Sequence, residues 1–443
     1  MFAVFLPALN FRGNRSPYLW WFYKFLSEFG ESAAYVCGDE YFLDPKVHHQ
    51  NGRDEASGEV ANQLGYQLPD ERLLHALRKA DIQVEVWQAL EQMFPGNPLE
   101  SFRHFCLKND ELLHEALTRA FNQLKQSHGN IEVVITCVNC ATLQRFCREQ
   151  SLPLLHIELG PFRSPQYLAT AYFDFSGVNG GTESQRRFNS SSNSMDPQND
   201  PLTVDAVRSL FMVGKPPLQT QPSCELGIGL QIEDDSNIIC YSNGFSSLSL
   251  LNNSRKLLAE RKLKAPVLVR GHPGSFFSPK NLPPGLSIDP SETAMKFIQS
   301  CKEVHTINSS LAVEFLLQGK KATVFGESPF SFCIDADTRE HLTSALCFFC
   351  LNYLVPWRLA ISSDYIRWRL LNSEEQAIRD IHMEFYMREK ITLLETQIAD
   401  LERELSEKNK QIAVLQSSIS WRLIYFFRKI FRFVSRRLGW ANK

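Results

Sequence analysis

The sequence predicts an α/β protein in which two doubly wound domains precede a coiled coil and a C-terminal amphipathic helix. Three observations predict this class. Short apolar runs alternate with helical patterns in two separate stretches, on either side of a polar segment at residues 176–224. From residue 387 onward the apolar residues follow heptad spacing, and the chain ends in a basic, apolar segment.

The composition is that of a folded, water-soluble body with an unusual tail. The 443 residues are 44% hydrophobic and 22% charged, which excludes wholesale disorder and a polytopic membrane protein. Residues 420–443 hold seven Lys or Arg and no Asp or Glu, so the preceding residues carry a net charge of −9, against −2 for the whole chain. This asymmetry indicates a body that performs chemistry and a tail that binds an anionic surface.

The first domain is predicted from alternating elements in residues 1–160. Its expected strands are Phe2–Leu6, Ala33–Val36, Glu132–Thr136 and Leu154–Glu158, and its clearest helices are Glu71–Lys79, Val84–Gln92 and Asp110–Gln126. The polar residues 176–224 that follow predict a long loop with one short helix near Leu202–Val213. We place the boundary between domains 1–200 and 201–385 in this segment.

The second domain repeats the alternation. Its expected strands are Gly227–Ile232, Pro266–Arg270, Val304–Ile307 and Ala322–Phe325, and its expected helices are Ser246–Arg261, Ser291–Ser300 and Leu311–Leu317. Open parallel sheets bind ligands beyond the carboxyl ends of their strands. Two such domains facing each other predict a cleft between them.

A coiled coil is predicted for residues 386–419. Its a and d positions are apolar with one polar interruption at Lys408, and they comprise Ile391, Leu394, Ile398, Leu401, Leu405, Ile412, Leu415 and Ile419. Ile at the early a positions with Leu at d favours a parallel two-stranded coiled coil, so we expect a homo-oligomer, a dimer or a trimer. The alternative is one long helix packed on its own domain.

Residues 420–443 predict an amphipathic helix at a membrane surface. Apolar residues such as Phe427, Ile430 and Phe431 share one helical face, and cations such as Arg422 and Lys429 share another. The alternative is a helix docked on the body. Because residues 1–7 lack the basic start of a signal peptide, and the eleven cysteines include two CxxC pairs best interpreted as core residues, we expect a cytoplasmic, peripheral membrane protein.

Polar residues follow several predicted strands, at the edge where a doubly wound fold places its site. They are Glu158 with Arg163, the run Glu233, Asp234 and Asp235, His272 with Pro273, and Asn308, Ser309 and Ser310 ahead of Glu314. Each alone has an ordinary structural explanation, since Ser is a common helix cap and His-Pro a common turn. Together they combine an anion site, a proton donor and a base or nucleophile, which suits transfer from a phosphate-activated donor.

The order of these motifs resembles that of the bacterial capsule and O-antigen β-Kdo transferases. The resemblance covers roughly residues 150–330 and runs through Glu158-Leu-Gly-Pro-Phe-Arg163, Gly177-Val-Asn179, Gln231-x-x-x-Asp235, Gly271-His-Pro273 and the segment 307–321. It implies a GT-B-like fold with an acceptor-side first domain and a donor-side second domain. It also implies CMP-Kdo as the donor and a retaining double displacement.

The resemblance implies a role for each candidate residue. His272, Pro273, Asn308, Ser309, Ser310 and Gln231 would contribute to donor binding, with the CMP phosphate at His272 and the serines. Glu314 would bind the cytidine ribose, and Arg163 would pair with the sugar carboxylate. Asp235 would be the nucleophile, with Asp234 as a near-equal candidate, and Glu158 would act as acid, base or acceptor contact. Arg12 and Asn14 would contact the acceptor.

The same resemblance implies the partners. CMP leaves as a phosphate monoester, so we expect neither a metal nor another cofactor. The segment Ser418-x-Ser420-Trp421-Arg422 is similar to the ends of several O-antigen glycosyltransferases. It implies a lipid-linked O-antigen or capsule glycan as acceptor, on the inner face of the bacterial inner membrane, without nucleic acid. Two alternatives stay open: a CMP-sialic acid-type transferase, and a non-enzymatic coiled-coil scaffold or chain-length regulator.

Overall fold

The computed structural model describes residues 1–13, 16–192, 202–214, 221–261, 267–272, 274–275, 282–417 and 419–437. The chain forms two compact units, residues 1–384 and residues 385–443, which are described separately below. The first unit contains two sheets, and we call the parts around them the N-terminal lobe and the C-terminal lobe.

The N-terminal lobe is built on a seven-stranded sheet with the order β12-β6-β5-β4-β1-β2-β3. Its strands are β1 (Phe2–Phe5), β2 (Ala33–Cys37), β3 (Arg78–Asp81), β4 (Val133–Thr136), β5 (Leu154–Leu159), β6 (Thr170–Asp174) and β12 (Val355–Pro356). The five from β5 to β3 run parallel, in the 3-2-1-4-5 order of a Rossmann half. Every residue of β1, β2 and β4 is buried, as expected for strands covered on both faces.

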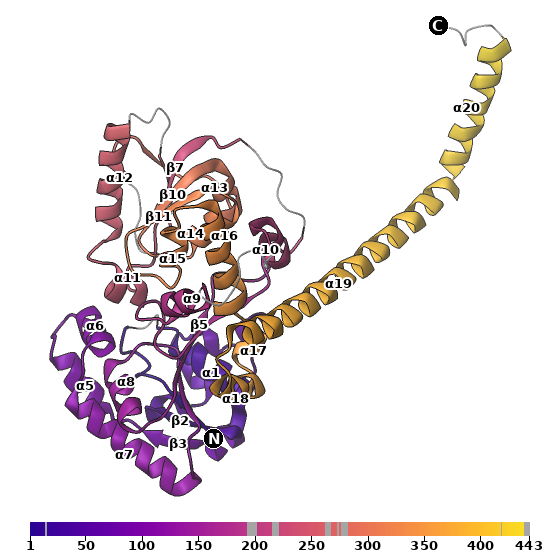
Figure 1. The fold of residues 1–443 in the computed structure, drawn as a ribbon. Coiled ribbons are helices and arrows are strands. Elements are labelled where there is room, and N and C mark those ends of the chain that lie inside the picture. Colours follow the sequence, from indigo (N-terminus) through magenta and orange to yellow (C-terminus); the bar gives the residue numbers. More distant parts are fainter. Residues whose placement is uncertain are drawn as a thin grey trace. The chain divides into compact units, whose positions relative to one another are not determined.

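Helices cover both faces of this sheet (Figure 1). They are α1 (Tyr18–Phe29), α2 (Pro45–Gln50), α3 (Gly58–Leu64), α4 (Glu71–Ala76), α5 (Val84–Gln92), α6 (Pro98–Leu107), α7 (Glu111–His128) and α8 (Ala141–Glu149). Helix α7 illustrates how these helices are capped and buried. Asp110 accepts a hydrogen bond from the Leu113 N–H and caps its start, and Leu113, Leu117 and Phe121 form its buried face.

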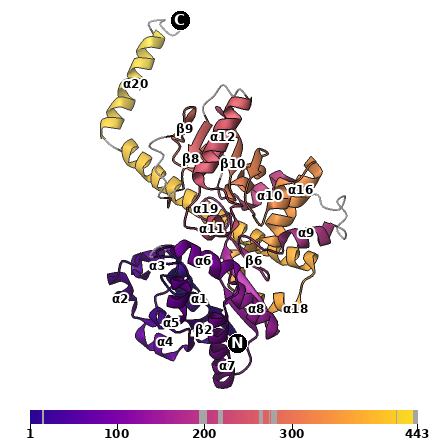
Figure 2. The same cartoon turned by 90° about the vertical axis from the view of Figure 1, so that its left-hand side faces the viewer.

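The C-terminal lobe is built on a five-stranded parallel sheet with the order β11-β10-β7-β8-β9. Its strands are β7 (Cys224–Gly229), β8 (Val267–Arg270), β9 (Leu286–Ile288), β10 (Cys301–Thr306) and β11 (Lys321–Val324). Its helices are α11 (Ser236–Tyr241), α12 (Ser247–Arg261), α13 (Ala294–Ser300), α14 (Leu311–Leu317), α15 (Ser331–Ile334) and α16 (Arg339–Phe348). Figure 2 shows α12 beside β8, where Leu250 and Leu251 pack against Val267 and Val269.

Two connections join the lobes. The outward connection contains α9 (Ser184–Ser192) and α10 (Val204–Phe211), and the return leads through a π-helical turn, Phe349–Tyr353, into β12, α17 (Trp357–Ala360) and α18 (Ser363–Leu371). Strand β12 pairs antiparallel with β6. On α18, Tyr365 packs on Phe173 of β6. Residues 355–371 therefore belong to the core of the N-terminal lobe, although they come from the later part of the chain.

The described residues of the second unit are helical. Helix α19 (Glu375–Ser417) begins in the first unit and extends into the second, and α20 (Ile419–Arg437) follows it. The described apolar heptad residues are exposed on α19, with exposed fractions from 46% at Leu394 to 65% at Leu401. Over the described residues, no helix has both the length and the apolar character needed to cross a membrane.

The predicted fold class is confirmed, since two parallel α/β sheets precede a long C-terminal helix. Two local predictions were wrong. The helix expected over Glu71–Lys79 ends at Ala76, and Arg78–Asp81 forms the edge strand β3. The segment 176–224 contains α9 in addition to the helix expected near Leu202–Val213. The four cysteines of the CxxC pairs are buried, as expected of core residues.

Candidate functional site

The candidate site lies at the carboxyl ends of the strands of both sheets. In each parallel order the chain changes direction next to the first strand, between β1 and β4 and between β7 and β10. Crevices at such switch points are the usual ligand sites of doubly wound folds. The segment from Gln231 to Asp235 follows β7, and the segment from Asn308 to Ser310 follows β10, so both flank the switch point of the C-terminal lobe.

Gln231 and Asn308 bind each other across that switch point. The Gln231 Nε2 donates to Asn308 Oδ1 at 2.8 Å, and the Asn308 backbone N–H donates to Gln231 Oε1 at 2.9 Å. Asn308 Nδ2 also donates to the carbonyl oxygens of Asn237 and Tyr241. Both side chains are buried. Their described contacts therefore fix the two loops relative to each other.

Asp235 begins helix α11. Its Oδ1 accepts hydrogen bonds from the backbone N–H and the Nδ2 of Asn237, at 2.9 and 3.1 Å. Helix α11 packs against α6 of the N-terminal lobe (Figure 2). The cap holds the Asp235 carboxylate at the junction of the two lobes.

Arg12 lies across the junction from Asp235, in the loop after β1. Its guanidinium is 5.4 Å from the centroid of the Phe102 ring and 6.0 Å from that of Tyr18. Burial acts to lower the pKa of Arg12, but surrounding groups outweigh it and raise the pKa. Those groups are Tyr18, Asp235, Asp234 and Glu158. Arg12 is therefore within electrostatic range of all three predicted catalytic carboxylates.

Glu158 lies near the end of β5, on the N-terminal lobe. Burial raises the pKa of its carboxyl group to about 7, and the charge of Asp235 contributes in the same direction. The backbone N–H of Leu159, which donates to Glu158 Oε1 at 2.7 Å, and the cations Arg163 and Arg12 act in the opposite direction. Near neutral pH both the protonated and the ionised forms of this carboxyl group are populated, so it can act as a general acid or as a general base.

His272 follows β8 on the C-terminal lobe. The Gly274 N–H donates to its Nδ1 at 3.0 Å, which places the ring proton of the neutral imidazole on Nε2. Desolvation lowers the pKa of His272, as does Arg163, whereas Asp235 and Glu233 raise it. Nε2–H is left as a donor near the carboxylates.

Glu314 and Arg163 complete the set. Burial raises the pKa of Glu314 to about 7, while the hydroxyl of Tyr167, which donates to Oε2 at 2.8 Å, and the charges of Arg163 and Arg270 lower it. Arg163 Nε donates to the Gly160 carbonyl at 3.1 Å. Because Arg163 influences the pKa values of Glu158, His272 and Glu314 alike, it lies among groups from both lobes.

The predicted set is thus largely brought together at one junction. Ser309 Oγ accepts from the Leu311 N–H at 3.3 Å, and Ser310 stands at the N-cap of α14 without a side-chain cap. Asn14 and Pro273 lie outside the described residues.

Sequence reasoning missed two tyrosines, and it named Glu233 without predicting its contact with Ser275. Tyr18 faces Arg12, and Tyr167 binds Glu314. Glu233 accepts hydrogen bonds from the Ser275 hydroxyl at 2.8 and 2.9 Å, which joins the loops after β7 and β8. The position of Tyr167, four residues after Arg163 in the same loop, was the available signal.

Comparison with known proteins gives a family match for part of the chain. Residues 4–183 match the model of the glycosyltransferase 99 family N-terminal domain. The match covers most of the N-terminal lobe, so this lobe is similar to the N-terminal domain of a glycosyltransferase family. No curated protein sequence matches the chain.

Several solved structures are similar to the chain. The β-Kdo 2,7 transferase KpsC from Thermosulfurimonas dismutans has 16% identity over 54% of this chain and 82% of its own, with a TM-score of 0.40. The β-Kdo 2,4 transferase KpsC from the same organism has 15% identity over 55% of this chain and 88% of its own, with a TM-score of 0.35. The glycosyltransferase SnogD from Streptomyces nogalater has 12% identity over 73% and 81%, with a TM-score of 0.26.

Proposed function

We propose that the protein is a retaining β-Kdo transferase that moves Kdo from CMP-β-Kdo to a lipid-linked O-antigen or capsule glycan. One observation carries the proposal: the carboxylates of Asp235, on the C-terminal lobe, and Glu158, on the N-terminal lobe, interact electrostatically with each other and with Arg12. The motif order supports the donor assignment, and the glycosyltransferase 99 match of residues 4–183 supports the reaction class.

The donor would lie on the C-terminal lobe. The Nε2–H of His272 and the hydroxyls of Ser309 and Ser310 would donate to the phosphate of CMP, and Glu314 would accept from the ribose. Arg163 offers a planar, permanently charged fork for the carboxylate of the sugar. These residues would hold the leaving group and the sugar in place through hydrogen bonds and ion pairs, without forming a covalent bond to either.

Asp235 would be the nucleophile of the first step. Its Oδ1 is held by the α11 cap, whereas its Oδ2 makes no hydrogen bond to any described residue. Oδ2 would attack the ketosidic carbon, the carbon–oxygen bond to CMP would break, and CMP would leave with the electron pair. Asp234 is the alternative nucleophile, being within range of Arg12 as well.

Glu158 would act in the second step. Its carboxylate would take the proton of the acceptor hydroxyl as that oxygen displaces Asp235 from the sugar. Two inversions give overall retention, as in glycosidases with paired carboxylates. Arg12, near both carboxylates, would stabilise their charges and contact the acceptor.

The mechanism is tested by trapping the covalent intermediate. Incubation with CMP-Kdo alone should give a protein whose mass is increased by one Kdo residue, located on a peptide containing Asp235. Asp235→Asn should lower turnover at least about 10³-fold while CMP still binds. An adduct on Asp234, or full turnover by Asp235→Asn, would refute the assigned nucleophile. Faster turnover of CMP-sialic acid than of CMP-Kdo would refute the donor assignment.

The second unit would supply membrane attachment and assembly. The exposed apolar row of α19 fits pairing with further copies of this helix, as in a parallel coiled coil. On α20, exposed Phe427 and Phe431 accompany the cations Arg428, Lys429 and Arg432, which suits the surface of an anionic membrane. We therefore assign the enzyme to the inner face of the bacterial inner membrane, as an oligomer.

A further inference from the structure

A large cavity lies in the first unit, away from the lobe junction. Its volume is about 1530 Å³. Its lining comes from α8 and the residues up to the start of β5, from the segment between β6 and α9, from α9 itself, and from the end of α18 to the first turn of α19. None of the candidate active-site residues lines it. It is larger than the ~300–1,000 Å³ of typical small-molecule pockets, so a ligand of several linked units fits it better than a single small molecule.

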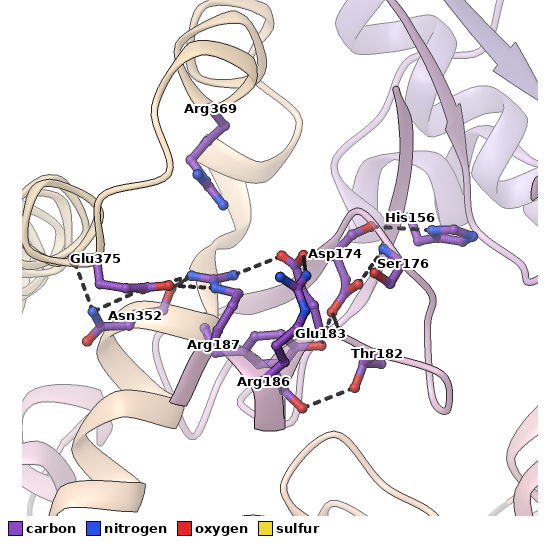
Figure 3. A network of polar contacts seen from close by, with 12 residues as sticks. His156, Asp174, Ser176, Thr182, Glu183, Arg186, Arg187, Asn352, Arg369 and Glu375 are labelled. Atoms are coloured by element: carbon purple, nitrogen blue, oxygen red, sulfur yellow. Dashed lines mark hydrogen bonds and ion pairs between the residues drawn. The ribbon is translucent and has the colours of Figure 1, made fainter. Parts of the chain in front are cut away.

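A buried ionic network builds one wall of the cavity. Arg187 binds Glu375 through two hydrogen bonds, Nε to Oε1 at 2.8 Å and Nη2 to Oε2 at 3.0 Å, and it also pairs with Glu183 (Figure 3). Arg186 binds the second oxygen of Glu183 at 3.1 Å. Since these contacts join α9 to the start of α19, the wall is held by charge-assisted bonds before any ligand arrives.

The lining carries more positive than negative charge. Five arginines and three glutamates line the cavity. Glu183 and Glu375 are bound to Arg186 and Arg187, and Glu374 accepts from two backbone N–H groups at the start of α19. Each of these glutamates therefore already has a partner, and the cavity lining keeps a net positive charge.

Arg369 and Arg148 carry two of the cavity's remaining positive charges. Arg369 is only 6% exposed, and Figure 3 shows its guanidinium directed toward the Arg187–Glu183 pair. It donates to the Asn372 carbonyl and lies 5.7 Å from the centroid of the Phe175 ring. Among the described residues, neither Arg369 nor Arg148 has a carboxylate within ion-pair distance. Glu183 and Glu375 act on Arg369 from a distance, but both form their ion pairs with Arg187. An anionic ligand would give Arg369 a direct partner.

The uncharged part of the lining suits a sugar chain. Leu152, Leu154 and Phe175 provide apolar surface for the C–H faces of sugar rings. The exposed Ser190 provides a hydroxyl, and the Gln144 side chain, whose Nε2 donates to the Ser176 carbonyl, provides an amide oxygen that can accept from sugar hydroxyls. Arginine is the preferred partner of carboxylates because its planar fork binds both oxygens.

From these observations we infer that the cavity is a second glycan site, which binds an acidic oligosaccharide through Arg369 and Arg148. The inference rests on the proposed function in one respect: a transferase that adds a carboxylate-bearing sugar makes a product of this class. The site would hold the growing acidic chain at a distance from the lobe junction.

The test is calorimetric titration of the full chain with a Kdo-terminated oligosaccharide, the same oligosaccharide without Kdo, and inorganic phosphate. We expect the Kdo-terminated probe to bind at least tenfold more tightly than the uncharged one. Arg369→Gln and the exposed Arg148→Gln should each weaken that binding at least tenfold, with CMP binding unchanged. Arg119→Gln, an exposed arginine on α7 outside the cavity, is the matched control and should leave the Kd unchanged.

Three outcomes would overturn the inference: equal affinity for the charged and uncharged oligosaccharides, an unchanged Kd in Arg148→Gln, or phosphate binding as tight and as arginine-dependent as the oligosaccharide. Because Arg148 is exposed, its replacement tests the site even where Arg369→Gln does not fold. The proposed function is measured separately by CMP release from CMP-Kdo. Arginine-dependent oligosaccharide binding without release of CMP from CMP-Kdo would support the glycan site in the cavity and refute the proposed transferase reaction.

Discussion

At the scale of single residues, Glu158 combines burial with a neighbouring carboxylate. Burial raises its pKa to about 7, so roughly half of the molecules carry a proton there at neutral pH. Because the proposed base must be ionised, kcat/KM should rise with pH between about 6 and 8, with an apparent pKa near 7. Initial rates across this range test it. Glu158→Gln should be at least about 10²-fold slower and lack this rise; a variant that kept the same pH profile would assign the titration to another group.

The same pKa shift predicts a change in folding stability. The pKa of a glutamate in an unfolded chain is about 4.3, and that of Glu158 in the folded protein is about 7, so the folded state binds the proton more tightly. The stabilisation is fully present below pH ~4.3 and is lost as the pH rises through about 7. Since glutamine does not titrate, Glu158→Gln should gain about 1–3 kcal/mol relative to the native chain between pH 4 and pH 8.

Urea unfolding at the two pH values measures this difference. Glu59→Gln, an exposed glutamate on α3, is the control and should show a change within about 0.5 kcal/mol. A pH-independent difference between native Glu158 and the glutamine variant would show that the group does not retain its proton in the folded protein.

At the residue scale, the sequence predicted the candidate site residues best where a polar side chain lies at or just beyond the end of a predicted strand. Glu158 ends a predicted strand, Asp235 and His272 lie within three residues of the ends of two others, and parallel topology brings such positions to one edge. Tyr18 and Tyr167 were missed because a tyrosine after a loop is equally consistent with core packing. Gln231 and Asn308 matched the motif, but their hydrogen bonds to each other arise from the loop geometry.

At the scale of elements, the connection after β6 depends on one buried carboxylate. Asp174 accepts hydrogen bonds from the backbone N–H groups of Ser176, Gly177 and Glu183, at 2.7, 3.0 and 2.9 Å, and from the Tyr353 hydroxyl at 2.8 Å. Asp174→Ala leaves these donors without that acceptor and should destabilise the protein by about 3 kcal/mol or more. Asp205→Ala removes an exposed carboxylate from α10 and should cost less than about 1 kcal/mol.

Denaturant unfolding of both variants measures the two costs. Equal destabilisation by Asp174→Ala and Asp205→Ala would show that the loop is held by other contacts.

The elements that could not be predicted lack a local signal. Strand β3 reads Arg-Lys-Ala-Asp, because an edge strand needs little apolar surface and charged side chains protect its free edge. Strand β12 has two residues and pairs with β6, which lies far earlier in the chain. Its pairing comes from the tertiary fold. The strands and helices with continuous apolar or amphipathic patterns, such as β1, α5 and α14, matched their predictions closely.

At the scale of the whole molecule, the apolar row on α19 predicts self-association. Replacing both Leu401 and Leu405 with Asp places charges in the proposed seam and should convert an oligomer into a monomer in sedimentation equilibrium. Thr396→Asp with Ser406→Asp adds the same charges outside the apolar row and should leave the oligomer intact. A native chain that sediments as a monomer at micromolar concentration would reject the coiled coil.

The last prediction concerns the basic end of the chain. The described part of α20 exposes Ile424, Phe427 and Phe431 beside Arg428 and Arg432, so its binding to a bilayer would combine apolar insertion with attraction to anionic lipid. Deleting residues 420–443 should abolish co-sedimentation with vesicles that contain anionic lipid, while turnover of a soluble acceptor changes less than about twofold. Binding by the native chain should also fall as salt rises, because surface charges are screened beyond about 8–10 Å near physiological ionic strength. Arg428→Gln with Arg432→Gln should weaken vesicle binding and reduce its salt dependence. Phe427→Ala with Phe431→Ala should also weaken vesicle binding but leave its salt dependence unchanged. A truncated chain that still binds anionic vesicles would place the membrane contact elsewhere in the protein.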